Sequence, residues 1–407
     1  MVQNDDASLG AQPLRQLLDP DAAQRIEPAL AATHNPRVWV YRYTHPTTGW
    51  TLSIATHGEP GSGQLSLGGF RIAPDYRTSR PGYDNDREAI ELAMGMEEKI
   101  YWSRLLRIGG PLLRSHPTAL VGGKCVLAPT PDARVGQPRD TELLDFALGC
   151  FRDFEATSGV LLSTGQDLGH GILSDGVTGS LAYVHARFRG GMLADTSKPT
   201  AEGNFQVLHG MLRGVGVAFG TARVGLIGCG NIGDHVLLRL RERGAGVDVL
   251  EASAPKRATL EANGVRVYAP EQKDEFLRLP FDAIVVNASG GSLDPHAIAL
   301  IAANPHVKVV CGSENLAMPE PAGAEALRAA GKLYCPTELG GMMGYLTAVE
   351  EYLAERDGVP FDVQTLFDAA RALETAAFDA ATYVRQRAME PAFDDAMRAV
   401  FAERATQ

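Results

Sequence analysis

Apolar residues follow two different periods along this chain, and the period predicts where strands and helices lie. Short apolar runs occur at 224–227, 247–250, 281–288 and 307–312, and the first is followed at once by apolar residues at helical spacing. Such runs are typical of buried parallel strands, which need helical connections. The second half of the chain is therefore predicted to contain a parallel α/β sheet.

The first half has strand-like runs before its long helices. Residues 1–35 carry apolar side chains at rough helical spacing and predict a helical lead-in. Two β-rich runs separated by turn residues predict a hairpin. The other elements expected here are strands at 65–72, 119–127 and 160–169 and helices at 87–106 and 140–158, besides the hairpin at 39–43 and 52–56; helices are expected again from about 348 onward.

A glycine-rich turn follows the apolar run 224–227. Gly228, Gly230 and Gly233 stand at G-x-G-x-x-G spacing, between a predicted strand and a predicted helix. In this context the first glycine permits a tight turn, the second lets backbone approach a pyrophosphate, and the third lets the helix pack closely. We expect a dinucleotide site here that also includes Asn231 and Ile232; the alternative is a turn with no ligand.

An acidic residue ends the next predicted strand. Glu251 lies 23 residues after Gly228, close to the distance of about 20 at which a carboxylate binds the ribose of NAD. A carboxylate accepts hydrogen bonds from a diol and repels a 2′-phosphate, which favours NAD over NADP. Lys256 and Arg257 lie nearby and leave NADP open.

Two asparagines lie at or just after the ends of later predicted strands. Asn287 falls in the run 281–288, and Asn315 follows the run 307–312. Ligands of open α/β sheets bind at the carboxyl ends of the strands. Both residues are therefore candidates for ribose or nicotinamide contacts, or else ordinary turn residues.

Three charged residues of the first half lie in unusual places. Lys99 is inside a predicted helix, where a lysine is by default on the surface. Lys124 lies in an apolar strand-like run, so its amine must either reach solvent or sit in a pocket where burial lowers its pKa. Asp167 ends a strand-like run, where a turn or helix cap is the ordinary explanation.

Composition limits the classes of function. The chain has 407 residues, of which 45% are hydrophobic and 21% charged, which suits a two-domain globular protein. A net charge of −11 without a basic stripe argues against nucleic acid. No apolar run has the length of a membrane span and no signal-like segment begins the chain, so we expect a cytoplasmic protein.

Cysteine and histidine usage argues against disulfides and metal. The five cysteines show no C-x-x-C spacing, and the ten histidines show no H-x-x-x-H spacing. We expect reduced, buried thiols and no metal site.

Several motifs, in their order along the chain, resemble those of the Glu/Leu/Phe/Val dehydrogenase family, most closely its leucine and phenylalanine dehydrogenase branch. The resemblance runs from about Leu67 to Glu351. The matching segments are Gly68-Gly69-Phe70-Arg71 (family Gly-Gly-x-Arg), Leu92 to Lys99 (Leu-Ala-x-Gly-Met-Thr-Tyr-Lys), Gly122-Gly123-Lys124 (Gly-Gly-Lys), Thr164 to Gly169 (Thr-Ala-Glu-Asp-Val-Gly), Thr200-Ala201-Glu202-Gly203 (Thr-Ala-x-Gly), Gly312 to Asn315 and Tyr334-Cys335-Pro336.

The resemblance implies a role for each matched residue. Lys99 would hold the substrate carboxylate, Lys124 would be the base that activates water, and Asp167 would carry the proton of the amino group. Gly68 and Gly69 would line the substrate site, and Thr200 the cofactor site. The implied fold is a substrate and dimerisation domain (1–200), a Rossmann domain (201–346) and C-terminal helices (347–407) that return to the first domain, with the site in the cleft between the domains.

The sequence departs from the family in three places. An insertion at about 107–118 separates the two lysines and must be looped out if they are to act together. The family's Asn-Ala-Gly-Gly segment is replaced by Gly341-Met342-Met343-Gly344, so Met342, Met343 and the following Tyr345 would form a bulky apolar wall. The loop 74–86 is also longer than usual.

We therefore expect NAD-dependent oxidative deamination of an apolar or aromatic L-α-amino acid to the 2-oxo acid and ammonium, by a homodimer or larger homo-oligomer. One alternative is a family member that acts on a non-proteinogenic amino acid or imine in a specialised pathway. Another is a catalytically silent sensor that only binds NAD.

Overall fold

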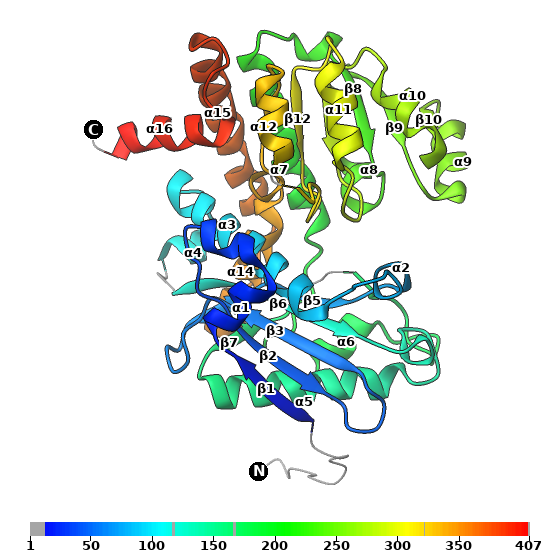
Figure 1. Ribbon diagram of the computed structural model, residues 1–407, viewed down its shortest axis with the longest axis vertical. Helices are drawn as coiled ribbons and strands as arrows, with labels where there is room; N and C mark the ends of the chain where they lie inside the picture. The colour runs from blue at the N-terminus through cyan, green and yellow to red at the C-terminus, as the bar shows by residue number, and fades with distance from the viewer. Residues whose placement is uncertain (1–12, 116–118, 166–167, 321, 406–407) are drawn as a thin grey trace. The chain divides into compact units, whose positions relative to one another are not determined.

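The computed structural model describes residues 13–115, 119–165, 168–320 and 322–405 (Figure 1). The chain divides into two compact units. The first contains Met1–Glu97 and Pro117–Ala194, and the second contains Glu98–His116 and Asp195–Gln407.

The first unit is built on one mixed sheet. Its strands lie in the order β1-β2-β3-β6-β4-β7, and β5 also pairs with β6. The pairs from β1 to β6 along this order are antiparallel, whereas β4 and β5 run parallel to β6, and β7 parallel to β4. The strands are β1 (Leu14–Leu18), β2 (Trp39–Thr44), β3 (Thr51–Thr56), β4 (Leu65–Leu67), β5 (Phe70–Ile72), β6 (Leu120–Ala128) and β7 (Leu161–Ser163).

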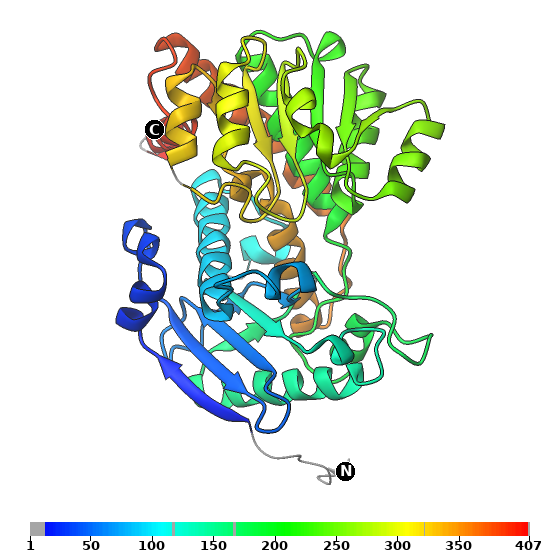
Figure 2. The same ribbon diagram turned by 45° about the vertical axis from the view of Figure 1, so that its right-hand side comes forward.

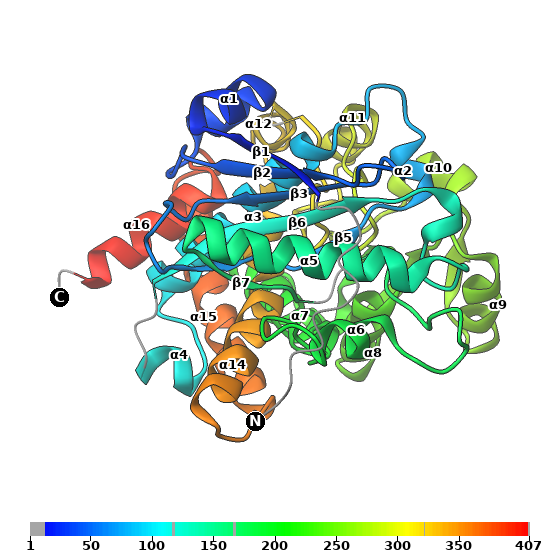
Figure 3. The ribbon, with the colours of Figure 1, turned by 90° about the horizontal axis from the view of Figure 1, so that it is seen from below.

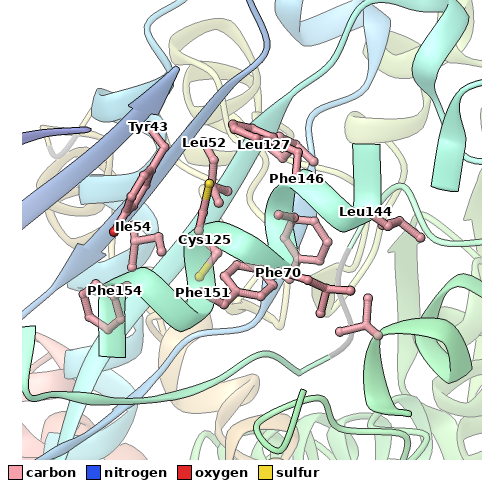
Figure 4. Close-up of a cluster of buried hydrophobic side chains, with 14 of the residues drawn as sticks. Tyr43, Leu52, Ile54, Phe70, Cys125, Leu127, Leu144, Phe146, Phe151 and Phe154 are labelled. Atoms are coloured by element: carbon pink, nitrogen blue, oxygen red, sulfur yellow. The ribbon is translucent and has the colours of Figure 1, made fainter. Parts of the chain in front are cut away.

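The two faces of β6 meet different neighbours, as the two-residue period of a strand requires. Cys125 and Leu127 point into the main apolar core, which α5 (Asp140–Ser158) covers (Figures 3 and 4). In that core the rings of Phe70 and Phe151 meet edge to face, 5.2 Å apart. Gly122 lies on the opposite face, against the backbone of α3 (Asn85–Leu106). The shorter helices of this unit are α1 (Pro20–Ile26), α2 (Asp75–Thr78) and α6 (Ser180–His185).

The helical lead-in expected at 1–35 is wrong in part. Leu14–Leu18 forms β1, an edge strand paired with β2, and the helix α1 begins only at Pro20. Asp19 caps that helix, because its side chain accepts a hydrogen bond from the backbone N–H of Ala22. Pairing with β2 decides the conformation of Leu14–Leu18, and such non-local pairing leaves no clear mark on a short stretch of sequence.

The second unit contains a parallel sheet of six strands. Their order is β10-β9-β8-β11-β12-β13, and every neighbouring pair is parallel. Counted from β8, this is the strand order 3-2-1-4-5-6 of the dinucleotide-binding fold. The strands are β8 (Arg223–Ile227), β9 (Gly246–Leu250), β10 (Arg266–Tyr268), β11 (Ala283–Val286), β12 (Val309–Gly312) and β13 (Leu333–Tyr334).

Helices pack on this sheet and on one another (Figure 2). Close packing of α7 on α15 requires small residues, because Cβ atoms at Gly210 and Gly214 would overlap or crowd atoms of α15. The helices wholly within this unit are α4 (Pro111–Ser115), α7 (Ser197–Gly214), α8 (Asn231–Glu242), α9 (Ala254–Ala262), α10 (Lys273–Leu277), α11 (Pro295–Ala303), α12 (Ala322–Ala329), α13 (Thr337–Gly340), α14 (Met342–Asp357), α15 (Gln364–Gln386) and α16 (Phe393–Ala405).

The two-domain α/β architecture predicted from the sequence is confirmed. The domain boundaries at 200 and 346 and the return of 347–407 to the first domain stay predictions. No helix among the described residues is long and apolar enough to cross a membrane. All five cysteines are buried and free, and the described part of the chain holds no group of three or more metal-ligating side chains suited to an ion.

Candidate functional site

The three glycines of the turn after β8 meet three different surroundings. Gly228 has φ +84°, and a Cβ there would lie 2.7 Å from the backbone nitrogen of Ala288. A Cβ at Gly233 would overlap the carbonyl oxygen of Gly228, whereas a Cβ at Gly230 would have no heavy atom of the described residues within 4 Å. Gly228 and Gly233 therefore make the turn compact, and Gly230 leaves open space beside it.

The helix α8 begins at this open space. Among the residues that the structure describes, no side chain caps its N-terminus, and Asn231 and Ile232 supply the first N–H groups of the helix. The free N–H groups and the dipole at a helix N-terminus favour an anion such as a pyrophosphate. The turn thus fits the phosphates of a dinucleotide.

The carboxylate of Glu251 lies beside the same turn. One oxygen accepts a hydrogen bond from Cys229 N at 2.8 Å, and the other accepts one from Ser253 N at 2.7 Å. Two carboxylate oxygens offer about four acceptor positions, so the group retains capacity for a sugar diol. The nearby cations have other partners: Lys256 pairs with Asp234, and Arg257 donates to the carbonyls of Glu251 and Ala252.

A network of amides and hydroxyls joins the ends of β11 and β12. The Oδ1 atom of Asn287 accepts hydrogen bonds from Ser313 N at 3.1 Å, from Ser313 Oγ at 2.7 Å and from Asn204 Nδ2 at 2.8 Å. Glu314 is buried, and its carboxylate accepts bonds from the backbone N–H groups of Ala288 and Ser292. These contacts fix the loops at the carboxyl edge of the sheet, where ligands of this fold bind.

Lys99 is only 6% exposed, so the surface interpretation of this residue is wrong. Its Nζ atom donates a hydrogen bond to Asn315 Oδ1 at 2.9 Å, and an added Cβ at Gly341 would lie 3.5 Å from the same amine. Leu316, which follows Asn315 in the chain, has a positive φ of 55°. This conformation is strained for leucine, and such strain often marks a functional loop. The second unit thus brings Lys99 to the end of β12.

Lys124 lies in the first unit and is 5% exposed. Its Nζ atom would be 3.3 Å from a Cβ added at Gly69. Gly69 has φ +74°, and the same Cβ would lie 3.0 Å from the carbonyl oxygen of Gly165. A Cβ at Gly68 would overlap the carbonyl of Gly123. Gly69 therefore allows the amine of Lys124 to lie over backbone, and Gly68 allows the chain after β4 to pack closely on the backbone of β6.

The remaining predicted residues have mixed placements. Asp167 lies outside the described residues. Met342 and Met343 are fully buried, and Met343 packs against Gly203 of α7. The hydroxyl of Tyr345 is 2.8 Å from Ser103 Oγ, and that of Thr200 donates to the Thr196 carbonyl.

The insertion after Lys99 is anchored at its start. Its helix α4 is held by Glu350, whose carboxylate accepts hydrogen bonds from Leu112 N at 3.1 Å and Leu113 N at 2.8 Å. Glu350 is itself 2% exposed. The helix Pro111–Ser115 is therefore packed within the second unit.

Sequence reasoning missed several buried polar residues around these groups. Asn204, Ser313 and Glu314 complete the network at the strand ends. Ser313 and Glu314 lie inside the matched segment Gly312 to Asn315, and Asn204 directly follows the matched segment Thr200 to Gly203, but the motifs alone gave these three residues no role. Glu338, which is partly buried, was also missed: burial raises its pKa above the ordinary value, and the charge of Lys99 opposes that rise. The only sign of Glu338 in the sequence was its position two residues after Pro336 of the matched segment, and nothing there indicated that it lies near Lys99.

The chain is similar in sequence or fold to several amino-acid dehydrogenases. The chain is 27% identical over 293 residues to a valine dehydrogenase of Streptomyces virginiae, covering 66% of this chain and 70% of that protein. It matches an L-tryptophan dehydrogenase from Nostoc punctiforme with a TM-score of 0.58 and 18% identity, over 90% of this chain and 94% of the other.

A hetero-hexameric glutamate dehydrogenase from Thermus thermophilus, in its leucine-bound form, matches with a TM-score of 0.62 and 15% identity. That match covers 97% of this chain and 88% of the other. No family model matches the chain.

Proposed function

We propose that this chain belongs to the Glu/Leu/Phe/Val dehydrogenase family and catalyses the reversible NAD-dependent oxidative deamination of an apolar or aromatic L-α-amino acid. The relatives described above, which are amino-acid dehydrogenases, support the family resemblance. The observation that carries the proposed activity is one combination of features: a dinucleotide turn with open space at Gly230, and two buried lysines, Lys99 and Lys124, in matched motifs.

NAD is the proposed cofactor. When bound, it accepts the hydride from the α-carbon of the amino acid. The backbone of Gly228–Gly233 and the first N–H groups of α8 would hold the pyrophosphate, and Glu251 the ribose diol. Support for NAD over NADP comes from Lys256 and Arg257, which are engaged by Asp234 and by backbone carbonyls instead of facing a phosphate.

Lys99 and Lys124 are proposed to have different roles toward the substrate. Lys99, fixed by its bond to Asn315, would hold the α-carboxylate. Loss of hydride leaves an imine, and water attacks it only if a base takes up a proton. Lys124 would be that base, since burial favours the neutral form of an amine. From its motif, Asp167 would move the proton to and from the amino group.

The other candidate contacts follow the same division. Thr200, Asn287 and Asn315 are proposed to line the nicotinamide and its ribose. Met342, Met343 and Tyr345 are proposed to shape the side-chain pocket, in keeping with an apolar or aromatic substrate.

The test is turnover with a panel of the proteinogenic L-amino acids, with NAD and with NADP, followed by absorbance of the reduced cofactor. We expect NADH formation with at least one apolar or aromatic substrate, a larger kcat/KM with NAD, and loss of turnover in a folded Lys124→Ala variant. No NADH formation with any amino acid, and no ammonium-dependent NADH oxidation with the matching 2-oxo acids, would overturn the proposal for these substrates.

The segment Gly341–Gly344 favours a second candidate, a dehydrogenase for a non-proteinogenic amino acid, because it departs from the family motif where the substrate side chain is expected. Such an enzyme would fail the proteinogenic panel and still turn over a larger or modified analogue. A silent NAD-binding protein would bind NADH and fail with both.

A homo-oligomer in the cytoplasm is the proposed assembly and location. The edge strand β1 exposes Leu14 and Leu17, and an exposed apolar edge is suited to pairing with a second copy. The free cysteines suit a reducing compartment. Light scattering of the purified protein measures the assembly.

A further inference from the structure

One buried carboxylate inside the matched segment Leu92 to Lys99 has no role in the mechanism above. Glu97 is 6% exposed and stands where the family motif Leu-Ala-x-Gly-Met-Thr-Tyr-Lys has threonine. Its Oε2 atom accepts a hydrogen bond from the backbone N–H of Gly122 at 2.6 Å. Gly122 begins the Gly-Gly-Lys segment that carries Lys124.

The other oxygen of the same carboxylate reaches a third segment. Oε1 of Glu97 accepts a hydrogen bond from Asn35 Nδ2 at 2.9 Å, and His34 Nε2 lies 3.9 Å away. The carboxylate therefore joins α3, β6 and the chain before β2 at one point. A threonine hydroxyl, one carbon from the backbone, is too short to make the same set of bonds.

The contact at Gly122 bears directly on Lys124. Side chains two residues apart on a strand leave the same face, so Lys124 projects from the face of β6 that α3 covers. Contact between the two backbones is close, because a Cβ at Gly122 would overlap Glu97 N. A shift of α3 along β6 would therefore move the surroundings of the lysine amine.

We propose that Glu97 is a positioning residue for Lys124: its carboxylate fixes α3 on β6 through the backbone of Gly122 and so keeps the lysine amine over Gly69. The bond is charge-assisted and buried, which makes it stronger than a neutral one. This inference deepens the proposed function and rests on Lys124 being the base.

The experiment compares wild type with Glu97→Ala, Glu97→Thr and Glu97→Gln in the full-length protein. Asp140→Ala is the matched control, because Asp140 is also a fully buried carboxylate of the first unit that accepts backbone N–H bonds, from Gly136 and Ser174. For each protein, kcat, the Kd for NADH, the thermal midpoint and the acetylation rate of Lys124 by acetic anhydride, located by peptide mass spectrometry, are measured.

Glu97→Gln retains an oxygen for Gly122 N, so its kcat and labelling rate should stay within about twofold of wild type. Glu97→Ala and Glu97→Thr should lower kcat by about 10-fold or more, since small misplacements of a catalytic group are costly. They should also raise the labelling rate of Lys124 by about fivefold, as the amine becomes easier to expose. NADH affinity should not change, and Asp140→Ala should lower only the thermal midpoint.

Two results would overturn the inference: wild-type kcat and labelling in both Glu97→Ala and Glu97→Thr, or the same changes in Asp140→Ala. If Glu97→Ala does not fold, the threonine variant decides. If wild type shows no amino-acid turnover, the proposed function fails, and the labelling rate alone still decides whether Glu97 positions Lys124.

Discussion

The substitution Gly230→Ala should have different effects on the stability of the protein and on its affinity for the cofactor. In the described part of the chain the added methyl group would have no heavy atom within 4 Å, and the extended backbone at this position, with φ −75° and ψ −157°, does not require glycine. Replacing glycine by alanine at a helix N-cap costs about 1 kcal/mol or less. The unliganded protein should therefore lose about 3 °C or less of thermal midpoint.

The affinity for NADH should decrease much more than the stability of the protein. The methyl group would fill the space that the pyrophosphate needs at the N-terminus of α8. Loss of one or two hydrogen bonds to a charged group costs about 3 kcal/mol, which is about a 100-fold increase in the Kd for NADH. Titration of NADH fluorescence measures it.

Gly233→Ala is the matched comparison, since its methyl group would overlap the carbonyl oxygen of Gly228. Overpacking of this kind costs about 1–3 kcal/mol, so the thermal midpoint should fall by about 5 °C. The reasoning is refuted if Gly230→Ala binds NADH as tightly as wild type, or if it destabilises the protein more than Gly233→Ala does.

Three further predictions concern charge. Glu251→Ala should raise the KM for NAD about 10-fold and leave the KM for NADP unchanged or lower in steady-state assays, because a diol acceptor is lost. Burial lowers the pKa of His57 to about 4, so the free energy of unfolding of the wild type should fall as the pH falls from 6.5 towards 4. Denaturant titrations measure this free energy at pH 7 and at pH 4.5. The decrease from pH 7 to pH 4.5 should be about 2 kcal/mol smaller in His57→Gln than in wild type. Burial, with the charge of Glu27, raises the pKa of Glu91 to about 7, so stability from its neutral form is lost as the pH rises from 4.5 through 7, and Glu91→Gln should raise the thermal midpoint at pH 8 but not at pH 5. For each substitution, a change in stability that is the same at its two pH values would contradict the argument from that residue's pKa.

The parts of the molecule that the sequence predicts are those specified by neighbouring residues. The turn Gly228–Gly233, its flanking strand and helix, and Glu251 at the end of β9 fall within one short segment, where glycine spacing and apolar period act together. The parallel sheet follows from the same period, and its strand order agrees with the fold that the motif implies.

The parts that the sequence could not predict depend on distant residues. Leu14–Leu18 is a strand because β2 pairs with it. Lys99 is buried because it meets Asn315, which is 216 residues away in the chain. The carboxylates of Glu97 and Glu314 are bound by backbone N–H groups of segments that only the tertiary structure brings to them. Periodicity carries no information about such contacts.

The central claim is that this chain moves the α-hydrogen of an amino acid to NAD. It is tested most directly by incubating the protein and NAD with apolar and aromatic L-amino acids that carry deuterium at the α-carbon, one at a time, and analysing the reduced cofactor by mass spectrometry. The account predicts NADH with one deuterium at the nicotinamide ring for at least one substrate, and none from a folded Lys124→Ala variant. Unlabelled NADH, or no NADH with any of them, would contradict it.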